Sequence, residues 1–473
     1  MATLSDISRR SALGLLGAGA AGFALFGPRG RSAPPKGRLV LDYWEKWTGL
    51  EGKAMGEVVD AFNASQDRLF VRYLITGTIH QKALISIAGG VSPDIIGLNS
   101  FTVPTYAESG AILPLDDLAA KAGLRMNDYA AGMRRVMQHN GRWWATINTG
   151  GTLALYYNKG LFAECEAELR QRGLDASRAP RTIEEWELAS EAITKTKRDG
   201  TIERAGHLHI EPGWWSWIWG YSFGGTIFDE DRQLALAGSA ENLAAYAWLE
   251  RTSAGRVEHV KRFTEGFGPY GTARSAFLTG QVAMVVQGPW LANQIKEHRP
   301  NLDYGVAPVP TAAAVYDPAA PIACIDTDVL MIPAGAKHPE ASMEFIAFTQ
   351  RQDNVEKLAL AHCKGSPMVK ASDSFVAQHP NRGVRLHTQL ADSPRAFFAP
   401  RTPVWAEMKD PFDTAVLSMW RQQLQSGPTL AGLQRGAQAM IDRNNKLKQR
   451  RGEPTAGPTS GPAAGPAAAG ATS

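Results

Sequence analysis

The chain has 473 residues, of which 44% are hydrophobic and 20% charged, and its formal net charge is +4. This is the composition of a globular protein, and the length predicts two or more lobes. Residues 1–33 carry four arginines and one aspartate, a net charge of +3, so only 4 − 3 = +1 remains on the rest. That balance excludes the basic surface expected of a nucleic-acid-binding protein.

The first 33 residues have the pattern of an export signal. Arg9 and Arg10 precede an apolar, Gly/Ala-rich run over 12–26 that is too short for a stable membrane-spanning helix. The arginine pair resembles the Tat signal, and no Cys follows the run to carry a lipid anchor. We therefore expect a periplasmic protein that is not a lipoprotein and has no membrane span after signal removal.

The next elements alternate between strands and helices. Residues 39–44 and 69–75 are predicted strands, and 52–63 and 80–88 have helical spacing. A third strand follows Pro93 and Asp94, and a hairpin turn is expected at 140–144. This order is typical of a parallel sheet covered by helices, so the fold class is α/β.

Further along, 154–159 is a predicted strand that runs into a helix. Thr182 and Glu185 form a capping-box pattern before a helix that continues to about residue 196. Helices are expected from Pro339 onward, over 411–425 and over 430–448. Residues 452–473 consist of Pro, Ala, Gly, Ser and Thr with one charge, a composition typical of a disordered tail.

The stretch 275–292 combines several signals in one unit. Gly280 is a predicted left-handed helix cap, and 282–286 is an apolar run suited to a strand buried on both faces. Gly288 turns the chain and Pro289 is expected at the first position of a new helix. Trp290 is thereby placed where a strand end meets a helix, the edge at which open α/β sheets bind ligands.

Several phrases occur in one order along residues 39–420, and together they resemble a known family: A-G-G-V-S-P-D-I (88–95), E-S-G-A-I-L-P-L-D-D-L (108–118), L-Y-Y-N-K-G-L-F (155–162), P-R-T-I-E-E-W (180–186), A-F-L-T-G-Q-V-A-M-V-V-Q-G-P-W (276–290), G-V-A-P-V-P (305–310) and K-H-P-E-A-S-M-E-F-I-A-F (337–348). The family is the extracellular solute-binding proteins of ABC importers, of the maltose/oligosaccharide-binding type. The resemblance implies the periplasmic-binding-protein fold: two lobes, each a mostly parallel sheet flanked by helices, joined by hinge crossovers. It also implies a carbohydrate ligand, an ABC permease as partner, no cofactor and no catalysis; a monomer is expected.

On this basis the chain is divided into five predicted segments: an export signal (1–33), a first lobe (39–148), a second lobe (149–320), a hinge return with a C-terminal helical part (321–451) and a tail (452–473).

Residues 211–225 are the most aromatic stretch and a candidate platform for a sugar ring. Trp215, Trp217 and Trp219 alternate, so a strand would place them on one face whereas a helix would scatter them. Ring faces stack on the C–H face of a sugar, and in the resembled family aromatics near this position contact sugar. We expect Trp214 or Trp215 to contact ligand, although packing against a lobe is the alternative.

Sugar hydroxyls also need hydrogen-bonding partners, which we expect from residues at strand ends and near the hinge. With the aromatic candidates, the predicted ligand-binding set is Glu45, Trp47, Thr76, His80, Asn99, Ser100, Asn148, Thr149, Trp214, Trp215, Gly288, Trp290, Asp326 and Trp405.

Two alternatives remain at this stage. A secreted carbohydrate-active hydrolase would need two carboxylates facing each other across a cleft. A binding protein for a glycerophosphodiester would need cations there, with Lys46, Arg142 and Arg274 as candidates. His207 and His209 could hold a metal but lack a third ligand, and the three cysteines show no metal-binding spacing.

Overall fold

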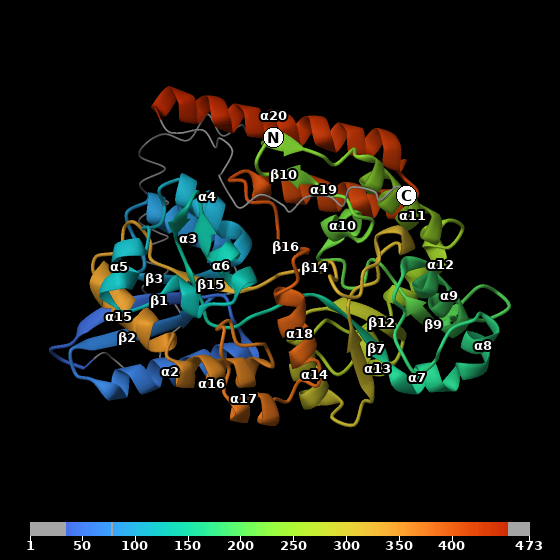
Figure 1. Cartoon of the computed structure of the whole chain (residues 1–473), viewed down its shortest axis with the longest axis horizontal. Coiled ribbons are helices and arrows are strands. Elements are labelled where there is room, and N and C mark those ends of the chain that lie inside the picture. The colour runs from blue at the N-terminus through green and yellow to red at the C-terminus, as the bar shows by residue number, and fades with distance from the viewer. Residues whose placement is uncertain (1–34, 77–78, 453–473) are drawn as a thin grey trace, which may run out of the picture.

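The computed structural model describes residues 35–76 and 79–452, and the predicted export signal and residues 453–473 of the predicted tail lie outside them. Two five-stranded sheets lie side by side and define two lobes (Figure 1). Each has its own hydrophobic core, with Tyr43 and Phe345 among the buried residues of lobe 1 and Trp186 and Tyr246 among those of lobe 2.

The sheet of lobe 1 begins with the parallel strands that the sequence predicts. β1 pairs in parallel with β2 and β3, and β15 then joins β3 antiparallel from far along the chain. The strands in sheet order are β2 (Leu69–Ile75), β1 (Leu39–Glu45), β3 (Ile95–Asn99), β15 (Asp328–Met331) and β6 (Thr146–Ile147). The helices of this lobe are α2 (Gly49–Ser65), α3 (Ile79–Ala88), α4 (Val103–Glu108), α5 (Asp116–Lys121), α6 (Ala131–Met137), α15 (Pro339–Thr349) and α16 (Gln352–His362).

The sheet of lobe 2 is built around β12, whose six residues are all buried. β12 lies between β7, which is antiparallel to it, and β9, which is parallel. The strands in order are β13 (Tyr304–Ala307), β7 (Ala154–Asn158), β12 (Val282–Gln287), β9 (Ile202–His207) and β8 (Lys195–Thr196). The helices are α7 (Lys159–Glu164), α8 (Glu166–Gln171), α9 (Ile183–Ile193), α10 (Trp219–Ser222), α11 (Ala240–Ser253), α12 (Val257–Thr264), α13 (Ala276–Thr279), α14 (Leu291–His298), α19 (Trp405–Trp420) and α20 (Ser426–Arg451).

The lobes are joined by segments that run side by side. Leu153 N donates to Cys324 O (2.8 Å), and Asp326 N donates to Gly151 O (3.1 Å). β14 (Ala323–Cys324) also pairs with β16 (Ala396–Phe397), so a third pass of the chain lies against the first two. The remaining elements are the hairpins β4 (Gln138–His139) with β5 (Arg142–Trp143) and β10 (Phe228–Asp229) with β11 (Leu234–Ala235), and the helices α17 (Asp373–Gln378) and α18 (Val384–Ala391).

Several local predictions are confirmed, whereas the start of one helix differs. Gly280 adopts φ 76° at the end of α13, and the hairpin at 138–143 forms as predicted. The helix after β12 begins at Leu291 rather than at Pro289, because Gly288 and Pro289 are used in the turn that sets Trp290 at its N-terminal end. At the predicted capping box, Glu185 N donates to Thr182 Oγ1 (3.3 Å) as expected, whereas the Glu185 carboxylate accepts from Arg181 N.

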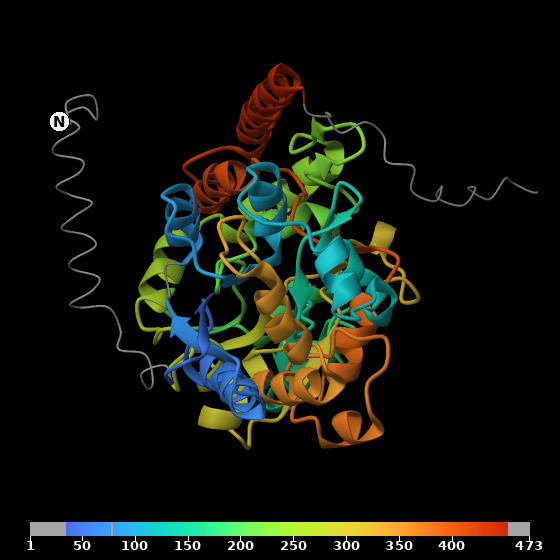
Figure 2. The same ribbon diagram turned by 90° about the vertical axis from the view of Figure 1, so that its left-hand side faces the viewer.

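The C-terminal helices differ from the prediction in their bounds. α19 begins at Trp405, six positions before the predicted start at Pro411, which lies inside the helix. Trp405 is 1% exposed, so packing of this first turn into lobe 2 sets the start rather than the local proline signal. α20 runs along the top of the molecule, outside both sheets (Figures 1 and 2).

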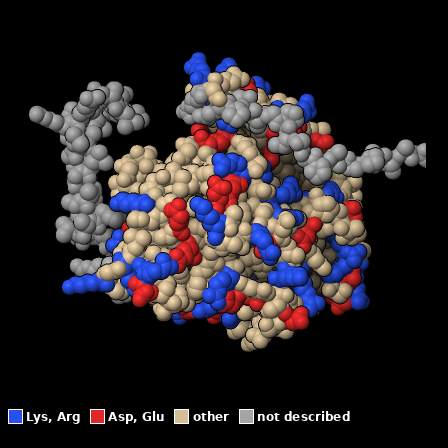
Figure 3. Space-filling model, turned by 60° about the vertical axis from the view of Figure 1, so that its left-hand side comes forward, with Lys and Arg blue, Asp and Glu red and all other residues tan. Residues whose placement is uncertain are grey.

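The surface carries both signs of charge. On the face shown in Figure 3, Lys and Arg side chains are interspersed with Asp and Glu. Most surface ion pairs are exposed, such as Arg68 with Glu344 and Arg382 with Asp303. Such pairs add little stability, and they leave no large basic field on this face.

Candidate functional site: a cavity between the lobes

A cavity of about 550 Å³ lies between the two lobes and beside the crossover segments. Its volume is in the range of small-molecule sites. Residues of α4, β4 and the loops after β1 and β3 line it from lobe 1, and residues of 213–217, 290 and α19 line it from lobe 2. The lining residues are Lys46, Glu51, Asn99, Ser100, Phe101, Val103, Pro104, Val136, Gln138, Gly213, Trp214, Trp215, Trp217, Trp290, Cys324, Ile325, Asp326, Asp328, Lys364, Phe398, Ala399, Arg401, Trp405, Lys409 and Asp413.

Lobe 2 supplies an aromatic wall. The rings of Trp215 and Trp290 are 6.0 Å apart and inclined at 37°, and Trp214 meets Trp215 edge-on at 5.5 Å. Trp214 is 41% exposed, whereas Trp217 is almost fully buried against Trp405. The rings thus offer both a flat apolar surface and a rigid support behind it.

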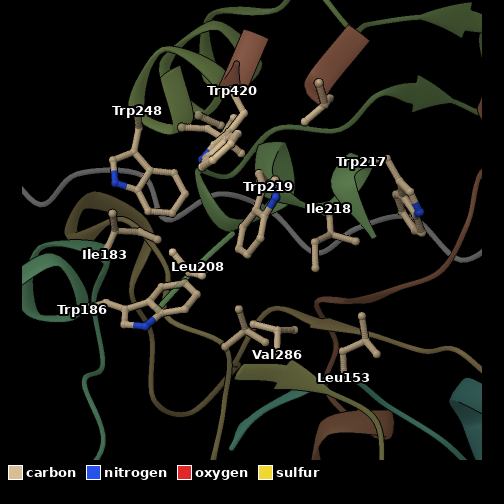
Figure 4. Packing of buried hydrophobic residues seen from close by; sticks show 14 of the residues in the cluster. Leu153, Ile183, Trp186, Leu208, Trp217, Ile218, Trp219, Trp248, Val286 and Trp420 are labelled. Carbon is tan, nitrogen blue, oxygen red and sulfur yellow. The ribbon is translucent and has the colours of Figure 1, made fainter. Parts of the chain in front are cut away.

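A 3₁₀ turn (Ser216–Ile218) followed by α10 determines where the tryptophans of 211–225 lie. This winding sends Trp214, Trp215 and Trp217 to the cavity and Trp219 into the core of lobe 2. There Trp219 packs near Trp186 and Trp248, well apart from Trp217 (Figure 4). The strand-face interpretation of the alternation is therefore wrong.

The orientation of Trp290 follows from the turn in which it lies. Its Nε1–H donates to the buried Gln287 Oε1 (3.0 Å), which also accepts from Tyr270 OH (3.2 Å). The ring lies flat over Gly288, where an added Cβ would come within 2.2 Å of it. Gly288 therefore positions the ring and offers no side chain to a ligand.

Lobe 1 supplies a charged wall organised around Asp328, the first residue of β15. Its carboxylate accepts from Trp47 Nε1 (2.8 Å), Asn99 Nδ2 (3.1 Å) and Lys364 Nζ (3.2 Å), and Lys46 Nζ lies 2.6 Å away. Burial raises the pKa of Asp328, but Lys46 and Lys364 outweigh it and hold the pKa well below its usual range. The carboxylate is therefore charged and its lone pairs are occupied.

Lys364 links this wall to the tryptophans. The ammonium group contacts Glu51 (3.1 Å) as well as Asp328, and it lies 5.4 Å from the ring of Trp47 and 5.5 Å from that of Trp290. Burial alone would lower the pKa of Lys364, yet Glu51 and Asp328 raise it above its usual value. A cation facing two indoles across the lobe boundary is held by charge and by cation–π attraction.

Asp326 differs from the other acids in the cavity. Its Oδ2 accepts from Trp215 Nε1 (2.7 Å), and burial together with the charge of Asp328 raises its pKa. Within the part of the chain that the structure describes, it is the one carboxylate of the cavity wall without a Lys or Arg partner. It stands at the crossover between β14 and β15, where it can accept hydrogen bonds from a ligand.

Each basic side chain of the cavity is already in an ion pair. Lys46 and Lys364 meet Asp328, Arg401 lies 3.4 Å from Glu230, and Lys409 pairs with Asp413, which also accepts from Ser216. The cavity wall holds four cations and four carboxylates, so their formal charges cancel. The arrangement suits a ligand that carries no net charge.

The structure places seven of the predicted site residues on the cavity wall: Asn99, Ser100, Trp214, Trp215, Trp290, Asp326 and Trp405. His80 is not on the wall, and its ring stacks at 5.9 Å on Phe101, which is. Thr76 is half-buried and donates its backbone N–H to Glu45 O.

Four other predicted residues are structural. Glu45 is buried and accepts from Tyr43 OH, Lys46 N and Trp47 N, and burial raises its pKa to about 7. The indole N–H of Trp47 donates to Asp328. Asn148 is bonded to Thr349 and Gln350 beneath the crossover, and Thr149 O accepts from Thr327 Oγ1 (2.6 Å).

Sequence reasoning missed Asp328, Glu51, Lys364, Lys409 and Asp413 as lining residues, and considered Lys46 only for a charged ligand. The motif D-T-D (326–328) holds a usable signal, since alternate residues of a strand entering β15 share a face. No sequence signal indicates Lys364, because it follows α16 in an ordinary polar stretch.

Metal and disulfide chemistry find no support in the described residues. No group of three or more His, Cys, Asp or Glu side chains is arranged to hold a metal ion there. His207 Nε2 instead faces His209 Nδ1 at 3.1 Å beside Trp186. Cys165, Cys324 and Cys363 are free and buried.

Comparison with known proteins assigns the chain to a family. Residues 47–356 match the family described as bacterial extracellular solute-binding protein. The chain belongs to this family. No helix among the described residues is long and apolar enough to cross a membrane.

Relatives and solved structures agree with this assignment. A maltotriose-binding protein of Pyrococcus abyssi is 22% identical over 277 residues, which cover 58% of this chain and about half (55%) of that relative. The structure titled CpMnBP1 with mannotriose bound superposes with a TM-score of 0.72 at 23% identity, over 85% of this chain and 100% of that one. UgpB of Mycobacterium tuberculosis, in complex with glycerophosphocholine, gives a TM-score of 0.66 at 22% identity, over 87% and 100%. These likenesses establish the two-lobed binding-protein fold.

Proposed function

We propose that this solute-binding protein captures an uncharged mono- or oligosaccharide between its lobes and delivers it to an ABC permease without altering it. The observation that carries the proposal is the pairing of an aromatic wall, Trp215 and Trp290, with Asp326, a carboxylate without a Lys or Arg partner, in one cavity. Stacking rings and a few fixed polar groups are what recognition of a sugar requires. The maltotriose and mannotriose ligands of similar proteins support the same class.

A glycerophosphodiester is the second candidate, since one similar structure binds glycerophosphocholine. Its phosphate would need cations free to bind it. Lys46 is held by Asp328, and Arg142 and Arg274 lie outside the cavity wall. Binding a phosphate would therefore require breaking buried ion pairs, which favours the uncharged ligand.

A hydrolase is disfavoured by the occupation of its candidate carboxylates. Asp328, Glu51 and Asp413 are all bonded to cations, so none is placed as a free base or nucleophile beside Asp326. The family consists of solute-binding proteins, which agrees with binding without turnover.

The proposal is tested by titrating intrinsic Trp fluorescence of the exported form with maltotriose, mannotriose, trehalose, single hexoses and glycerophosphocholine, while products are followed in the same samples. We expect a saturable change with an uncharged sugar and unaltered sugar afterwards. Product formation would overturn the transport role. Response to glycerophosphocholine alone would keep that role and replace the ligand class.

The permease as partner, the periplasm as location, the Tat route and the monomeric state belong to the same proposal. They rest on the family and on the pattern of residues 1–33. Expression of the chain with Arg9 and Arg10 both replaced by Lys tests the export route: the Tat proposal predicts that the protein stays in the cytoplasm.

A further inference from the structure

Helix α20 is anchored firmly in lobe 2. Leu430 near its start is fully buried in the core of that lobe. Further along, the side-chain oxygens of Gln434 and Gln438 accept from the backbone N–H groups of Gly238 and Ala235, both at 2.8 Å. The first four turns therefore move with lobe 2.

The last turns of the same helix reach lobe 1. Across residues 442–450, Lys448 is the one buried residue, at 8% exposure, and its neighbours are exposed or half-buried. Its Nζ lies 2.5 Å from Glu108 Oε2, and Glu108 Oε1 lies 2.8 Å from His139 Nε2. Figure 1 shows the helix extending over both lobes, with α4, which ends at Glu108, beneath its far end.

Burial of this trio would be unfavourable without the pairing. An ammonium group taken out of water is costly unless an opposite charge receives it. Burial raises the pKa of Glu108, but hydrogen bonds from His139 and Lys448 outweigh it and keep the carboxyl charged. A buried lysine at the end of an otherwise exposed segment is thus explained by its lobe 1 partner.

The contact is sensitive to the arrangement of the lobes. Lys448 lies ten positions beyond Gln438, about 15 Å of helix that acts as a stiff arm. Rotation of one lobe about the crossover segments displaces Glu108 relative to this arm and breaks the ion pair. The trio also adjoins the cavity, because Val103 and Pro104 of α4 and Gln138 beside His139 line its wall.

We propose that α20 is an interlobe latch, in which Lys448 carried by lobe 2 binds Glu108 and His139 of lobe 1 and holds the lobes closed even without ligand. The latch is independent of which solute the cavity takes. Its test uses no ligand, so its failure is distinguishable from failure of the sugar proposal.

The test measures interlobe distance in the ligand-free protein. Spin labels are attached at Val91→Cys on lobe 1, where the native side chain is 73% exposed, and at exposed Glu258→Cys on lobe 2. The three native cysteines are buried, which directs labelling to the introduced sites. Pulsed dipolar spectroscopy then gives the distance distribution.

We expect a narrow distribution for the latched protein and a longer, broader one for Lys448→Met. Glu108→Gln, which keeps shape and removes the charge, should give the same change, and Lys448→Arg should restore the narrow one. The matched control is Lys446→Met, an exposed lysine of the same helix turn. Circular dichroism confirms that each variant is folded. A broad distribution in the unaltered protein, or Lys448→Met and Glu108→Gln both matching Lys446→Met, overturns the proposal.

Discussion

The two walls of the cavity satisfy their polar groups in opposite ways. The lobe 1 wall is charged, but its charges are paired within the wall: Asp328 forms ion pairs with both Lys46 and Lys364. The lobe 2 wall is aromatic, with Trp290 fixed by Gln287 and Gly288 where it lines the cavity. The lobe 1 wall is therefore a scaffold in this proposal, and the lobe 2 wall, with Asp326 beside it, is the proposed recognition surface.

The largest effect is expected from breaking the scaffold. Asp328→Asn leaves the half-buried Lys46 and the buried Lys364 without their shared counter-ion, and loss of one partner of a buried ion pair costs about 3–5 kcal/mol. Urea denaturation should show a loss of that order. Asp303→Asn, which removes an exposed ion pair with Arg382, is the control and should cost less than about 1 kcal/mol. Equal losses would show that Asp328 does not organise the wall.

Acid should destabilise the protein because His362 and His387 are buried in the neutral form. Burial lowers the pKa of His362, which lies edge-on to Trp47, to about 4, and that of His387, bonded to Thr152 and Tyr156, to about 3. Because these folded pKa values lie below the unfolded value of about 6.5, the unfolded state binds more protons. The stability is fully present above pH 6.5 and is lost as pH falls towards 4.

Between pH 6 and 5 the two histidines together should cost about 2–3 kcal/mol of unfolding free energy, since each bound proton contributes about 1.4 kcal/mol per pH unit. Urea denaturation at both pH values measures the difference. His387→Gln should reduce the measured difference by about 1 kcal/mol, the share of one histidine; an unchanged difference in that variant contradicts the assignment.

Truncating the recognition surface should weaken binding with a smaller effect on folding. Trp290→Ala removes the ring over Gly288, and we expect a loss of about 1–3 kcal/mol in sugar binding, or about 5- to 150-fold in Kd. Trp290→Phe should retain most of the affinity. Tyr316→Ala, an exposed ring outside the cavity wall, is the control for titration calorimetry. Equal affinities for Trp290→Ala and the control would remove Trp290 from the site.

Salt should have the smallest effect. An uncharged sugar has no long-range attraction for screening to weaken, so raising NaCl from about 50 to 500 mM should change its Kd less than about twofold. Binding of a phosphodiester should weaken measurably over the same range. A steep salt dependence of the best ligand would mean that the lobe 1 cations bind it directly.

How far the sequence predicts this site depends on how local each signal is. The unit 275–292 could be read almost completely, because Gly280, the buried run and Trp290 lie within one stretch whose geometry follows from short-range rules. Trp214 and Trp215 were found by their density, but the division between Trp217 and Trp219 was not, since a short 3₁₀ turn leaves no periodic pattern.

The charged wall could not be predicted because its partners are distant in sequence. Lys46 and Asp328 are 282 positions apart, and Lys364 enters from the loop after α16. Glu45 and Asn148 were chosen because they follow strands. Position at a strand end places a residue near the cavity, but it does not show whether the side chain lines the cavity or is bonded beneath its surface. The latch residue Lys448 lies at the C-terminal end of a helix, where any cation suits the helix dipole, and no local pattern distinguishes it because its burial against α4 depends on tertiary packing.

Capture of a ligand by both walls is tested most directly by hydrogen–deuterium exchange of the ligand-saturated protein, using the strongest sugar from the titration panel. If both walls hold the ligand, protection rises together in 99–104 of lobe 1 and in 213–217 and 287–291 of lobe 2, the segments that meet at the cavity. Protection confined to one lobe, or absent from the Trp290 segment, would contradict it.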